Sequence, residues 1–476
     1  MEALKGMKSS TATLPTWNVE NVAENGAVIA RAGIAARIER LPANRMHMRA
    51  RILIGIATFF DGFDAIAIAA ALPLLIAKWS LSPAQVGMMI SAGAIGALIG
   101  AFVFPAAADR YGRVRAVAWS SAIIGLATLV SPSAPTFEIF MFLRVLQGIG
   151  LGGEVPIAAT YINEITSARN RGRFVLLYEL IFPIGLLVSS GIGAWLVPRY
   201  GWEVMYYIGA APLLLYLILG RLAPESPRWL AEKGRLKDAD AALRRFEACA
   251  RGPLAPVTMA ATELEAPSMH PRRRLADLLS APYRRRTVAV WFLWITCGFL
   301  QYGLTTWLPT IYRQVYHAPL QLSLNLALGA SLLGVVGSLV CALIVDRVGR
   351  KPVVYVSFVM CALSLLMAGM FHDSSLYVVA TFCAMAFGFM ASGFITAYVY
   401  TPELYPTSIR AVGCGVASAW LKGASIISPM ILATLLQGGR LETAFYLFAA
   451  VPFLAAVVVA AIGVETTGKS LESLEV

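Results

Sequence analysis

The sequence has few charged residues and few of the side chains from which catalytic and metal sites are usually built. Charged residues make up 14% of its 476 positions, and its four histidines are scattered along the chain. The six cysteines show neither a CxxC pair nor a metal-ligand spacing. These absences argue against an enzyme, a metal centre or a redox cofactor. No cofactor is expected, and the cysteines are predicted to be small core residues rather than disulfides.

Apolar residues are abundant instead, at 58% of the chain, with a mean hydropathy of +0.69. Twelve apolar stretches are long enough to cross a bilayer core of about 30 Å, which takes roughly 20 residues. They begin near residues 52, 85, 115, 138, 174, 203, 287, 323, 353, 375, 413 and 441. Because a lipid-exposed backbone must satisfy its own hydrogen bonds, each stretch is predicted to be a helix. The expected fold class is an all-α membrane protein with twelve transmembrane helices.

Lys and Arg residues fall mostly on one side of these helices. An even number of spans puts both termini on the same side, and of the 39 Lys and Arg residues only four fall in loops on the other side. These four are Lys78, Arg199, Arg313 and Arg440. The positive-inside rule therefore places both termini in the cytoplasm. The net charge of +12 then reports topology, and no nucleic-acid partner is expected.

The chain before the first span is expected to carry no secretory signal, because the only long apolar run begins after Arg51. Residues 28–51 instead mix arginines with Ala, Ile and Leu. This pattern is typical of an amphipathic helix lying on anionic headgroups. A cluster of charges that only sets topology is the alternative.

The sequence contains an internal repeat. Asp109–Arg113 reads DRYGR after the second span, and Asp346–Arg350 reads DRVGR after the eighth, about 240 residues later. Two further pairs have nearly the same spacing: Glu164 and Arg171 recur as Glu403 and Arg410, and Pro224–Arg228 has a weaker echo in Glu465–Gly468. We therefore expect two parallel six-helix halves. The expected segments are an amphipathic cytoplasmic tail (1–51), the first half (52–223), a cytoplasmic linker (224–286), the second half (287–464) and a cytoplasmic tail (465–476).

The paired DRxGR loops resemble those of the major facilitator superfamily, and the resemblance covers essentially the whole chain. In such a loop a carboxylate can lie at a helix N-terminus and the arginine against the Glu of a Glu-x6-Arg element, as a cytoplasmic latch between the halves. The resemblance implies one latch of Asp109, Arg113, Glu164 and Arg171, and a second of Asp346, Arg350, Glu403 and Arg410. The alternative is that topology-setting charges merely pair. Pro105 stands where the family usually has glycine.

Ionisable residues inside the spans are the candidates for function, because each charge at mid-bilayer costs roughly 2.5–3.5 kcal/mol. Asp61 and Asp64 are three residues apart on the first span and so lie on nearly one helix face. Two carboxylates this close tend to share a proton, which makes them candidate proton carriers. Arg144 on the fourth span is the expected counter-ion of Asp64, and Gly148 and Gly152 should allow a neighbouring helix to approach closely. A static salt bridge is the alternative.

Several resemblances within the superfamily can be separated. Pro224–Arg228 resembles sugar porters, whereas Asp61-Gly62-Phe63-Asp64 resembles the aromatic acid:proton symporters. The whole pattern is most similar to bacterial niacin-type transporters, relatives of synaptic vesicle glycoprotein 2 and the organic ion transporters. This implies a proton-coupled symporter of a small aromatic or heteroaromatic carboxylate, such as nicotinate or a benzoate derivative, in a bacterial inner membrane. A sugar or polyol porter, an organic cation transporter and a non-transporting sensor remain alternatives.

Lys422 lies near the middle of the eleventh span, about 18 Å from Arg410 at 1.5 Å per residue. Its position resembles the site at which organic anion transporters carry an arginine and organic cation transporters an aspartate. That resemblance implies that Lys422 binds an anionic substrate. The alternative is a structural pair with Asp61 or Glu154.

Further residues are expected at the substrate cavity or the cytoplasmic gate. The cavity candidates, on which a flat aromatic solute could stack, are Phe60, Phe63, Tyr178, Trp294, Gln301, Tyr302, Trp307 and Tyr398. A lipid-facing or core position is the alternative for any one of these aromatics. Glu154 and Glu179 are expected either at a gate or at the solvated edge of the cavity. The expected partners are a small organic acid, protons and the lipid bilayer, and a monomer is expected.

Overall fold

The computed structural model describes residues 33–42, 44–167, 180–250 and 275–467. The helices of the first half are α2 (Arg45–Trp79), α3 (Pro83–Tyr111), α4 (Arg113–Val130), α5 (Phe137–Ile165), α7 (Ile181–Tyr200), α8 (Glu203–Gly209) and α9 (Pro212–Leu222). Two short helices follow, α10 (Pro227–Glu232) and α11 (Leu236–Glu247). The second half contains α13 (Arg284–Phe299), the π-helical turn η4 (Leu300–Leu304), α14 (Leu308–Gln314), α15 (Leu320–Val348), α16 (Arg350–Met370), α17 (Leu376–Glu403), α18 (Thr407–Gln437) and α19 (Leu441–Ile462).

Twelve membrane spans are present in the described part of the chain, which confirms the predicted number. Two of these spans are interrupted. α8 and α9 form one span, and the break lies before Pro212, whose ring has no N–H to continue a helix. α13, η4 and α14 form another, in which Pro309 follows the π-helical turn.

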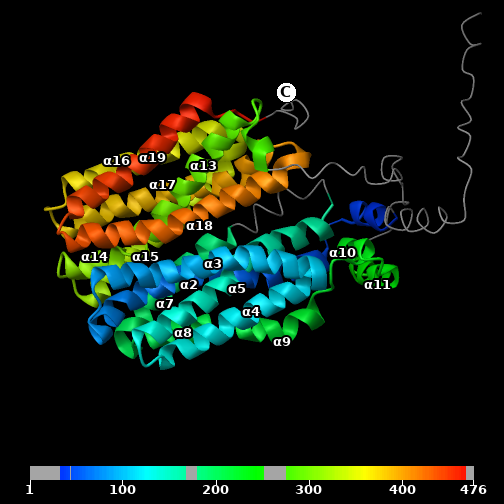
Figure 1. The fold of residues 1–476 in the computed structure, drawn as a ribbon, viewed down its shortest axis with the longest axis horizontal. Coiled ribbons are helices and arrows are strands. Elements are labelled where there is room, and N and C mark those ends of the chain that lie inside the picture. Colours follow the sequence, from blue (N-terminus) through cyan, green and yellow to red (C-terminus); the bar gives the residue numbers. More distant parts are fainter. Residues whose placement is uncertain (1–32, 43, 168–179, 251–274, 468–476) are drawn as a thin grey trace, which may run out of the picture.

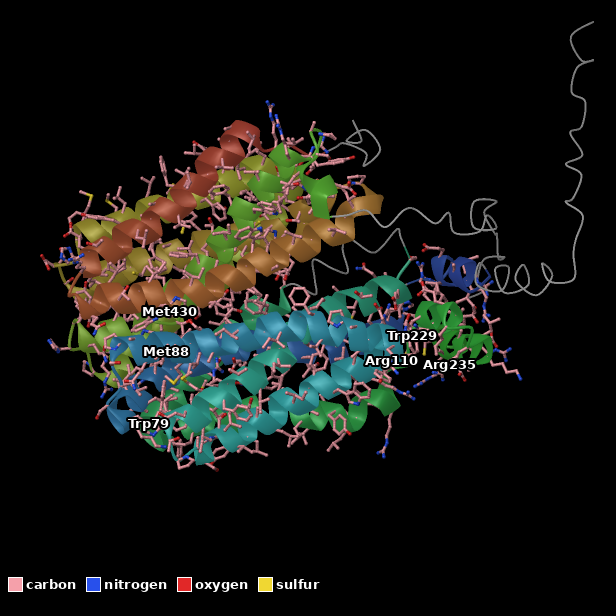
Figure 2. The ribbon with its side chains drawn as sticks, in the orientation of Figure 1. Trp79, Met88, Arg110, Trp229, Arg235 and Met430 are labelled. Carbon is pink, nitrogen blue, oxygen red and sulfur yellow. The ribbon has the colours of Figure 1, made fainter. Side chains whose placement is uncertain are left out.

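The two halves lie side by side, with α10 and α11 at one end of the first half (Figure 1). We call this the linker end and the opposite one the far end. Two hydrogen bonds that join the halves lie toward the far end: Ser91 Oγ donates to the Ile426 carbonyl at 2.6 Å, and Gln321 Nε2 to the Ala194 carbonyl at 2.7 Å. Met88 of α3 and Met430 of α18 lie where the halves meet (Figure 2).

Glycines allow α3 and α5 to pack with their backbones in contact. A Cβ at Gly148 would meet the Gly93 carbonyl, and one at Gly152 would meet the Ala97 carbonyl. The predicted close approach of a neighbouring helix to Gly148 and Gly152 is therefore confirmed, and the neighbour is α3.

The region predicted as one amphipathic helix over 28–51 has a different form where it is described. A short helix covers 33–39, and α2 begins at Arg45, because the Asn44 side chain accepts hydrogen bonds from the Met46 and His47 backbone N–H groups and caps it. Arg37 of the short helix forms ion pairs with Asp240 and Glu247 of α11, at 2.7 and 2.6 Å. This short helix is thus packed on the linker helices by named side chains.

The cysteines follow the prediction that they are not paired. All six are free, and Cys297, Cys341, Cys361 and Cys383 are buried. Cys249 and Cys414 are only half-buried.

Candidate substrate cavity and charge networks

A small cavity of about 30 Å³ lies between the two halves, and Asp61, Asp64, Arg144 and Lys422 all line it. The first half contributes Asp61, Asp64, Ala65 and Ile68 from α2, Ile90, Gly93, Ala94 and Ala97 from α3, and Arg144 and Leu151 from α5. The second half contributes Tyr302, Thr306, Lys422 and Ser425. The α2 residues have helical spacing of three, four and seven, so the predicted shared face of Asp61 and Asp64 is confirmed.

Asp64 is held by a buried network on its own half. Arg144 Nη1 lies 2.8 Å from Asp64 Oδ1 and also donates to the Gln147 side-chain carbonyl at 2.6 Å. Gln147 Nε2 donates to Asp64 at 2.7 Å and to Thr128 at 2.7 Å. The predicted pairing of Arg144 with Asp64 is present. Gln147 was not identified from the sequence, although it lies one helical turn after Arg144.

Asp61 and Lys422 face the same cavity without such a network. Neither side chain has a hydrogen bond or an ion pair within 4.0 Å among the residues that the structure describes. Lys422 Nζ lies 5.9 Å from the centre of the Tyr302 ring, a cation–π contact between two lining residues of the second half. The cavity therefore contains one tightly bonded ion pair and two further residues of opposite charge, Asp61 and Lys422, that are not hydrogen-bonded to each other.

The interruption of the seventh span places Tyr302 at the cavity. Tyr302 lies within the π-helical turn Leu300–Leu304, and the Thr305 hydroxyl donates to the Gln301 carbonyl, which the irregular backbone leaves available. Tyr302 and Thr306 line the cavity, whereas Gln301 is buried and is not among the lining residues.

Three of the predicted aromatic lining residues are elsewhere. Phe63 and Trp307 are each 1% exposed and belong to the apolar core, so their assignment to the cavity is wrong. Phe63 lies toward α8, since a Cβ added at Gly209 would be 3.5 Å from the Phe63 ring, because α2 turns this face toward its own half. Phe60 packs edge-on against Phe59 and is not a lining residue of this cavity either.

Trp294 and Tyr398 form an aromatic cluster nearer the linker end. Their rings are 4.9 Å apart, and both contact Phe394. Phe182 of α7 meets Phe394 at 6.2 Å across the boundary between the halves. Trp294 Nε1 also donates to Thr401 at 2.8 Å. These aromatics are thus brought together, but between the cavity and the linker end and not around the cavity itself.

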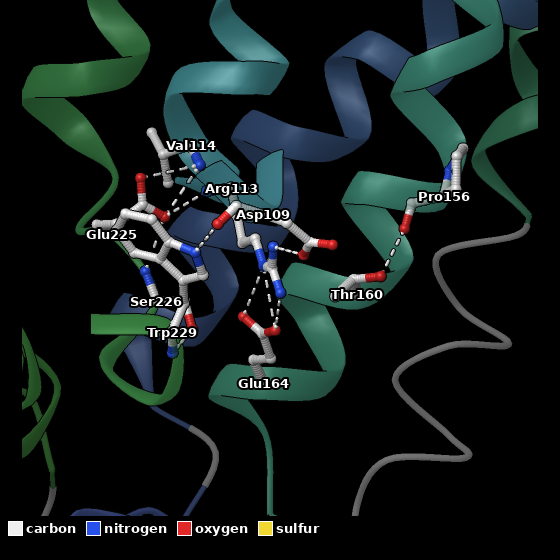
Figure 3. A network of polar contacts seen from close by, with 9 residues as sticks. All are labelled: Asp109, Arg113, Val114, Pro156, Thr160, Glu164, Glu225, Ser226 and Trp229. Carbon is white, nitrogen blue, oxygen red and sulfur yellow. Dashed lines mark hydrogen bonds and ion pairs between the residues drawn. The ribbon is translucent and has the colours of Figure 1, made fainter. Parts of the chain in front are cut away.

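The first DRxGR corner forms a charge network at the linker end (Figure 3). Arg113 Nη2 lies 2.9 Å from Glu164, and Arg113 Nη1 lies 2.5 Å from Asp109. The carboxylate at the N-terminus of α4 is Glu225, which accepts from the backbone N–H groups of Arg113 at 2.8 Å and Val114 at 3.1 Å. Burial raises the pKa of the Glu225 carboxyl, although these backbone N–H groups oppose the shift.

The second corner repeats this arrangement. Arg350 contacts Asp346 at 2.9 Å and Glu403 at 3.2 Å, and Glu465 accepts from the backbone N–H groups of Arg350 and Lys351. Partial burial disfavours the charged form of Glu465, but hydrogen bonds from Thr467 and from these N–H groups outweigh it and lower its pKa.

Both corners require a glycine for the same two reasons. Gly112 and Gly349 have φ angles of 115° and 105°, which favour glycine. In addition, a Cβ at Gly112 would meet Glu225 Oε2, and a Cβ at Gly349 would lie 2.8 Å from Glu465 Oε2. The weak sequence similarity between the Pro224–Arg228 and Glu465–Gly468 segments therefore reflects a role that their glutamates share. Glu225 and Glu465 each accept hydrogen bonds from the backbone at the start of the helix after a DRxGR corner.

The latch predicted from the sequence is wrong in several details. Among the described residues, the contacts of Arg113 stay within the first half and its linker, and those of Arg350 within the second half, so these contacts do not join the halves. Arg410 donates to the Tyr405 carbonyl at 3.2 Å and forms no ion pair among the described residues. The helix N-termini are capped by Glu225 and Glu465, because those carboxylates reach the backbone, while Asp109 and Asp346 bond to the arginines.

Glu154 is fully buried and accepts a hydrogen bond from Thr58 at 2.9 Å, which links α5 to α2. The interpretation of Glu154 as a solvated cavity edge is therefore wrong. The predicted residues Arg171, Tyr178 and Glu179 lie outside the described residues.

Two six-helix halves around a central charged cavity define a membrane transporter of the major facilitator class. The family model of the sugar (and other) transporters matches residues 41–476, and the chain belongs to this family. It is therefore a multi-pass membrane transporter and not an enzyme.

Relatives and solved structures agree with this assignment. The niacin transporter NiaP of Acinetobacter baylyi is 30% identical over 442 residues, which cover 93% of this chain and 99% of NiaP. The synaptic vesicle 2-related protein of Xenopus laevis is 28% identical, over 91% of this chain and 81% of that protein. The solved structure of the xylose transporter XylE from E. coli, partially occluded and inward-open, matches with a TM-score of 0.72 at 19% identity, over 89% and 99% of the two chains.

Proposed function

We propose that this protein is a proton-coupled symporter of a small aromatic or heteroaromatic monocarboxylate, such as nicotinate or a benzoate derivative. The observation that carries the proposal is the balance of charge in the cavity, where two carboxylates face two cations and only one pair, Asp64 and Arg144, is bonded. The name of the NiaP relative supports a heteroaromatic carboxylate as substrate.

Coupling follows from charge neutrality in a site with little water. With Asp61, Asp64, Arg144 and Lys422 all ionised, the cavity is neutral. A proton on Asp61 leaves Lys422 without a compensating charge, and a bound carboxylate restores neutrality. Because an uncompensated buried charge costs several kcal/mol, proton and anion bind more favourably together than either does alone. The site thereby favours entry of one proton with each monocarboxylate.

Asp64 serves as the second ionisable carboxylate of the first half. Its carboxylate oxygens are occupied by hydrogen bonds from Arg144 and Gln147, so this network must open before either oxygen can accept a proton. The second half contributes no carboxylate to the cavity among the described residues, and it contributes Lys422 and Tyr302. We therefore assign proton coupling to the first half and substrate charge recognition to the second.

The size of the cavity supports alternating access. A cavity of about 30 Å³ is far smaller than the roughly 300 Å³ at which small-molecule sites begin. The halves must therefore move apart to admit a substrate. The far end has the bonds between halves, whereas the aromatic contact of Phe182 with Phe394 lies on the way to the linker end. Parting of this aromatic contact would open the cavity toward the linker end.

We place the linker end in the cytoplasm of a bacterial inner membrane, with a monomer as the functional unit. The basis is the concentration of Lys and Arg residues on that side. Accessibility labelling of single cysteines at Arg199 and Arg347 in intact cells tests the orientation, since only the position at the far end should react with an impermeant reagent.

Uptake by purified protein in liposomes tests the function. We expect labelled nicotinate or benzoate to accumulate when the outside is acidic, and a protonophore to abolish the accumulation. Saturable xylose or glucose uptake that neither carboxylate inhibits would overturn the substrate assignment and favour a sugar porter.

Variants of the two aspartates test the coupling. Asp64→Asn should abolish uphill accumulation and retain counterflow exchange. Asp61→Asn should do the same and should also remove the dependence of uptake on external pH. Asp373→Asn is the matched control, because the Asp373 side chain is 93% exposed and lies outside the cavity. Uphill uptake that stays sensitive to a protonophore in both cavity variants would refute the coupling role.

Variants of Lys422 test recognition of the substrate charge. Lys422→Arg should retain part of the transport, and Lys422→Glu should abolish carboxylate uptake. Lys422→Gln should raise the half-saturating substrate concentration about tenfold or more, as expected for the loss of a charge-assisted hydrogen bond. Lys237→Gln, at an exposed position of α11, is the control. An unchanged half-saturating concentration in Lys422→Gln, with lower protein stability, would make Lys422 a structural residue.

A further inference from the structure

A second pocket, of about 260 Å³, opens at the linker end of the first half and shares no residue with the substrate cavity. It lies between the start of α4, the segment before α10, and α11. Its lining residues are Tyr111, Arg115, Pro224, Glu225, Trp229, Leu230, Arg235, Asp238, Ala241, Ala242 and Arg245. Figure 2 shows Arg110, Trp229 and Arg235 gathered at this end of the molecule.

The pocket has an excess of positive charge. Its two carboxylates are already engaged, since Glu225 accepts from the α4 backbone and Asp238 pairs with Arg235 at 2.7 Å. Arg115 and Arg245 are exposed and form no ion pair among the residues that the structure describes. Two guanidinium groups without a carboxylate, at the edge of an open pocket, are suited to an oxyanion and above all to a phosphate group.

An apolar stripe on α4 leads directly to Arg115. Trp119, Leu126 and Val130 are 39%, 52% and 49% exposed, and with Arg115 they have the spacing of one helix face. Exposed apolar residues on a membrane span face lipid. A guanidinium at the end of such a stripe therefore lies where headgroups begin.

A second stripe on α9 ends in the same place. Leu214, Leu217 and Ile218 are 64%, 59% and 41% exposed, and they share a face with exposed Arg221. Arg245 of the pocket donates to the Arg221 carbonyl at 3.5 Å, so this stripe also reaches the pocket rim. Tyr111, which is 42% exposed, adds an aromatic side chain of the kind enriched at membrane interfaces.

We propose that this pocket binds the phosphodiester of an anionic glycerophospholipid, with the headgroup between Arg115 and Arg245 and the acyl chains along α4 and α9. A free phosphate ester would use the guanidinium groups but not the two apolar stripes, which is why we commit to a lipid. The bound lipid would brace α11 against α4, beside the Glu225 cap. It would therefore stabilise the linker helices on the first half.

Lipid titration of the purified full-length protein in detergent tests this site. Native mass spectrometry measures bound phosphatidylglycerol, and thermal unfolding measures the stabilisation. Since each arginine near an anionic headgroup contributes roughly a fivefold factor, Arg115→Gln and Arg245→Gln should each weaken binding by about fivefold and the double variant by about 25-fold. The double variant Arg244→Gln with Arg347→Gln removes the same charge from exposed linker-end positions outside the pocket and should bind as the wild type does.

Each arm of the experiment has a defined outcome. Phosphatidylcholine and glycerol 3-phosphate should produce no comparable stabilisation in the same concentration range. An equal effect of glycerol 3-phosphate would show a site for a soluble phosphate ester and overturn the lipid assignment. Equal losses of phosphatidylglycerol binding in the pocket and control double variants would show that net charge alone attracts the lipid, and would overturn the site. If the Gln double variant fails to fold, the double variant Arg115→Lys with Arg245→Lys replaces it. This variant should bind phosphatidylglycerol with an affinity within a few-fold of the wild type. If it binds phosphatidylglycerol no better than phosphatidylcholine, the site is refuted.

Discussion

Replacing the carboxylates that cap α4 and α16, Glu225 and Glu465, is expected to change the free energy of unfolding by different amounts. Glu225 Oε1 accepts from the backbone N–H groups of Arg113, Val114 and Ser226 at 2.8, 3.1 and 3.0 Å, whereas Oε2 accepts from Val114 at 3.2 Å. The backbone N–H of Arg115 also bonds to this carboxylate. In Glu225→Gln the amide oxygen can occupy the Oε1 position and keep the three bonds made there. Glu225→Ala removes every acceptor. The hydrogen-bond acceptor, and not the charge, should therefore decide stability at this corner.

The magnitudes follow from these bonds. A buried donor without a partner costs about 1–3 kcal/mol, and because water can partly replace the lost acceptor at this half-buried corner, Glu225→Ala should cost about 2–4 kcal/mol. Burial raises the pKa of Glu225, so loss of its charge is cheap, and Glu225→Gln should cost under about 1 kcal/mol. Hydrogen bonds lower the pKa of Glu465, so Glu465→Gln should cost more, about 1–2 kcal/mol.

The contribution of each carboxylate to the free energy of unfolding changes with pH, and the change has opposite signs at Glu225 and Glu465. The raised pKa of Glu225 means that protonation favours the folded state, so acidification should stabilise the wild type relative to Glu225→Gln. The lowered pKa of Glu465 contributes stability above the unfolded value of about 4.3 and loses it as the pH falls through the folded value. The advantage of the wild type over Glu465→Gln should therefore shrink in acid.

Thermal unfolding of the purified protein, followed by tryptophan fluorescence between pH 7 and 4, measures these differences. Glu138→Gln and Glu138→Ala are the controls, because Glu138 is an exposed carboxylate in the first turn of α5, whose hydrogen bonds to Thr136 and to its own backbone N–H are open to water. Glu225→Ala should unfold several degrees lower than the wild type. The reasoning is refuted if Glu225→Ala unfolds as the wild type does, or if Glu225→Gln is as unstable as Glu225→Ala.

Two further predictions concern movement and docking. Gly87→Trp should block uptake by keeping the far end from closing, because a Cβ at Gly87 would lie 3.0 Å from the Ala433 Cβ of the other half. Gly220→Trp is the control and should transport normally, since a Cβ at Gly220 has no atom within 4 Å. Normal uptake by Gly87→Trp would show that transport does not require the close contact of Gly87 with Ala433. Glu247→Gln should speed hydrogen exchange of residues 33–39, because Arg37 of this segment is bonded to Glu247. The bonds from Arg37 lower the pKa of Glu247, so they stabilise the docked segment above pH about 4.3 and lose that effect in acid. Asp238→Asn on the same helix should leave that exchange unchanged, and equal exchange in the two variants would show that the bonds to Glu247 do not hold the segment.

The sequence predicted the features that depend on local composition and on spacing along one helix. Span number follows from apolar run length, and the shared face of Asp61 and Asp64 follows from helical periodicity. The Gly148 and Gly152 spacing predicted a close helix approach for the same reason, since it needs only one helix to be known. The expected pairing of Arg144 with Asp64 rested on a simple argument as well, because a buried charge requires a partner and few partners are available in the membrane.

Tertiary structure alone decided which side chains share a space. The sequence could not show that Phe63 and Trp307 are core residues, because an aromatic on a membrane helix packs equally well against lipid, core or substrate. It assigned the helix caps to Asp109 and Asp346, whereas Glu225 and Glu465 reach the backbone from segments more than a hundred residues away in the chain. The π-helical turn brings Tyr302 to the cavity, and the packing of the two halves places Lys422 and Asp61 at that same cavity. Both features depend on how separate helices pack, and no pattern along a single segment encodes that packing.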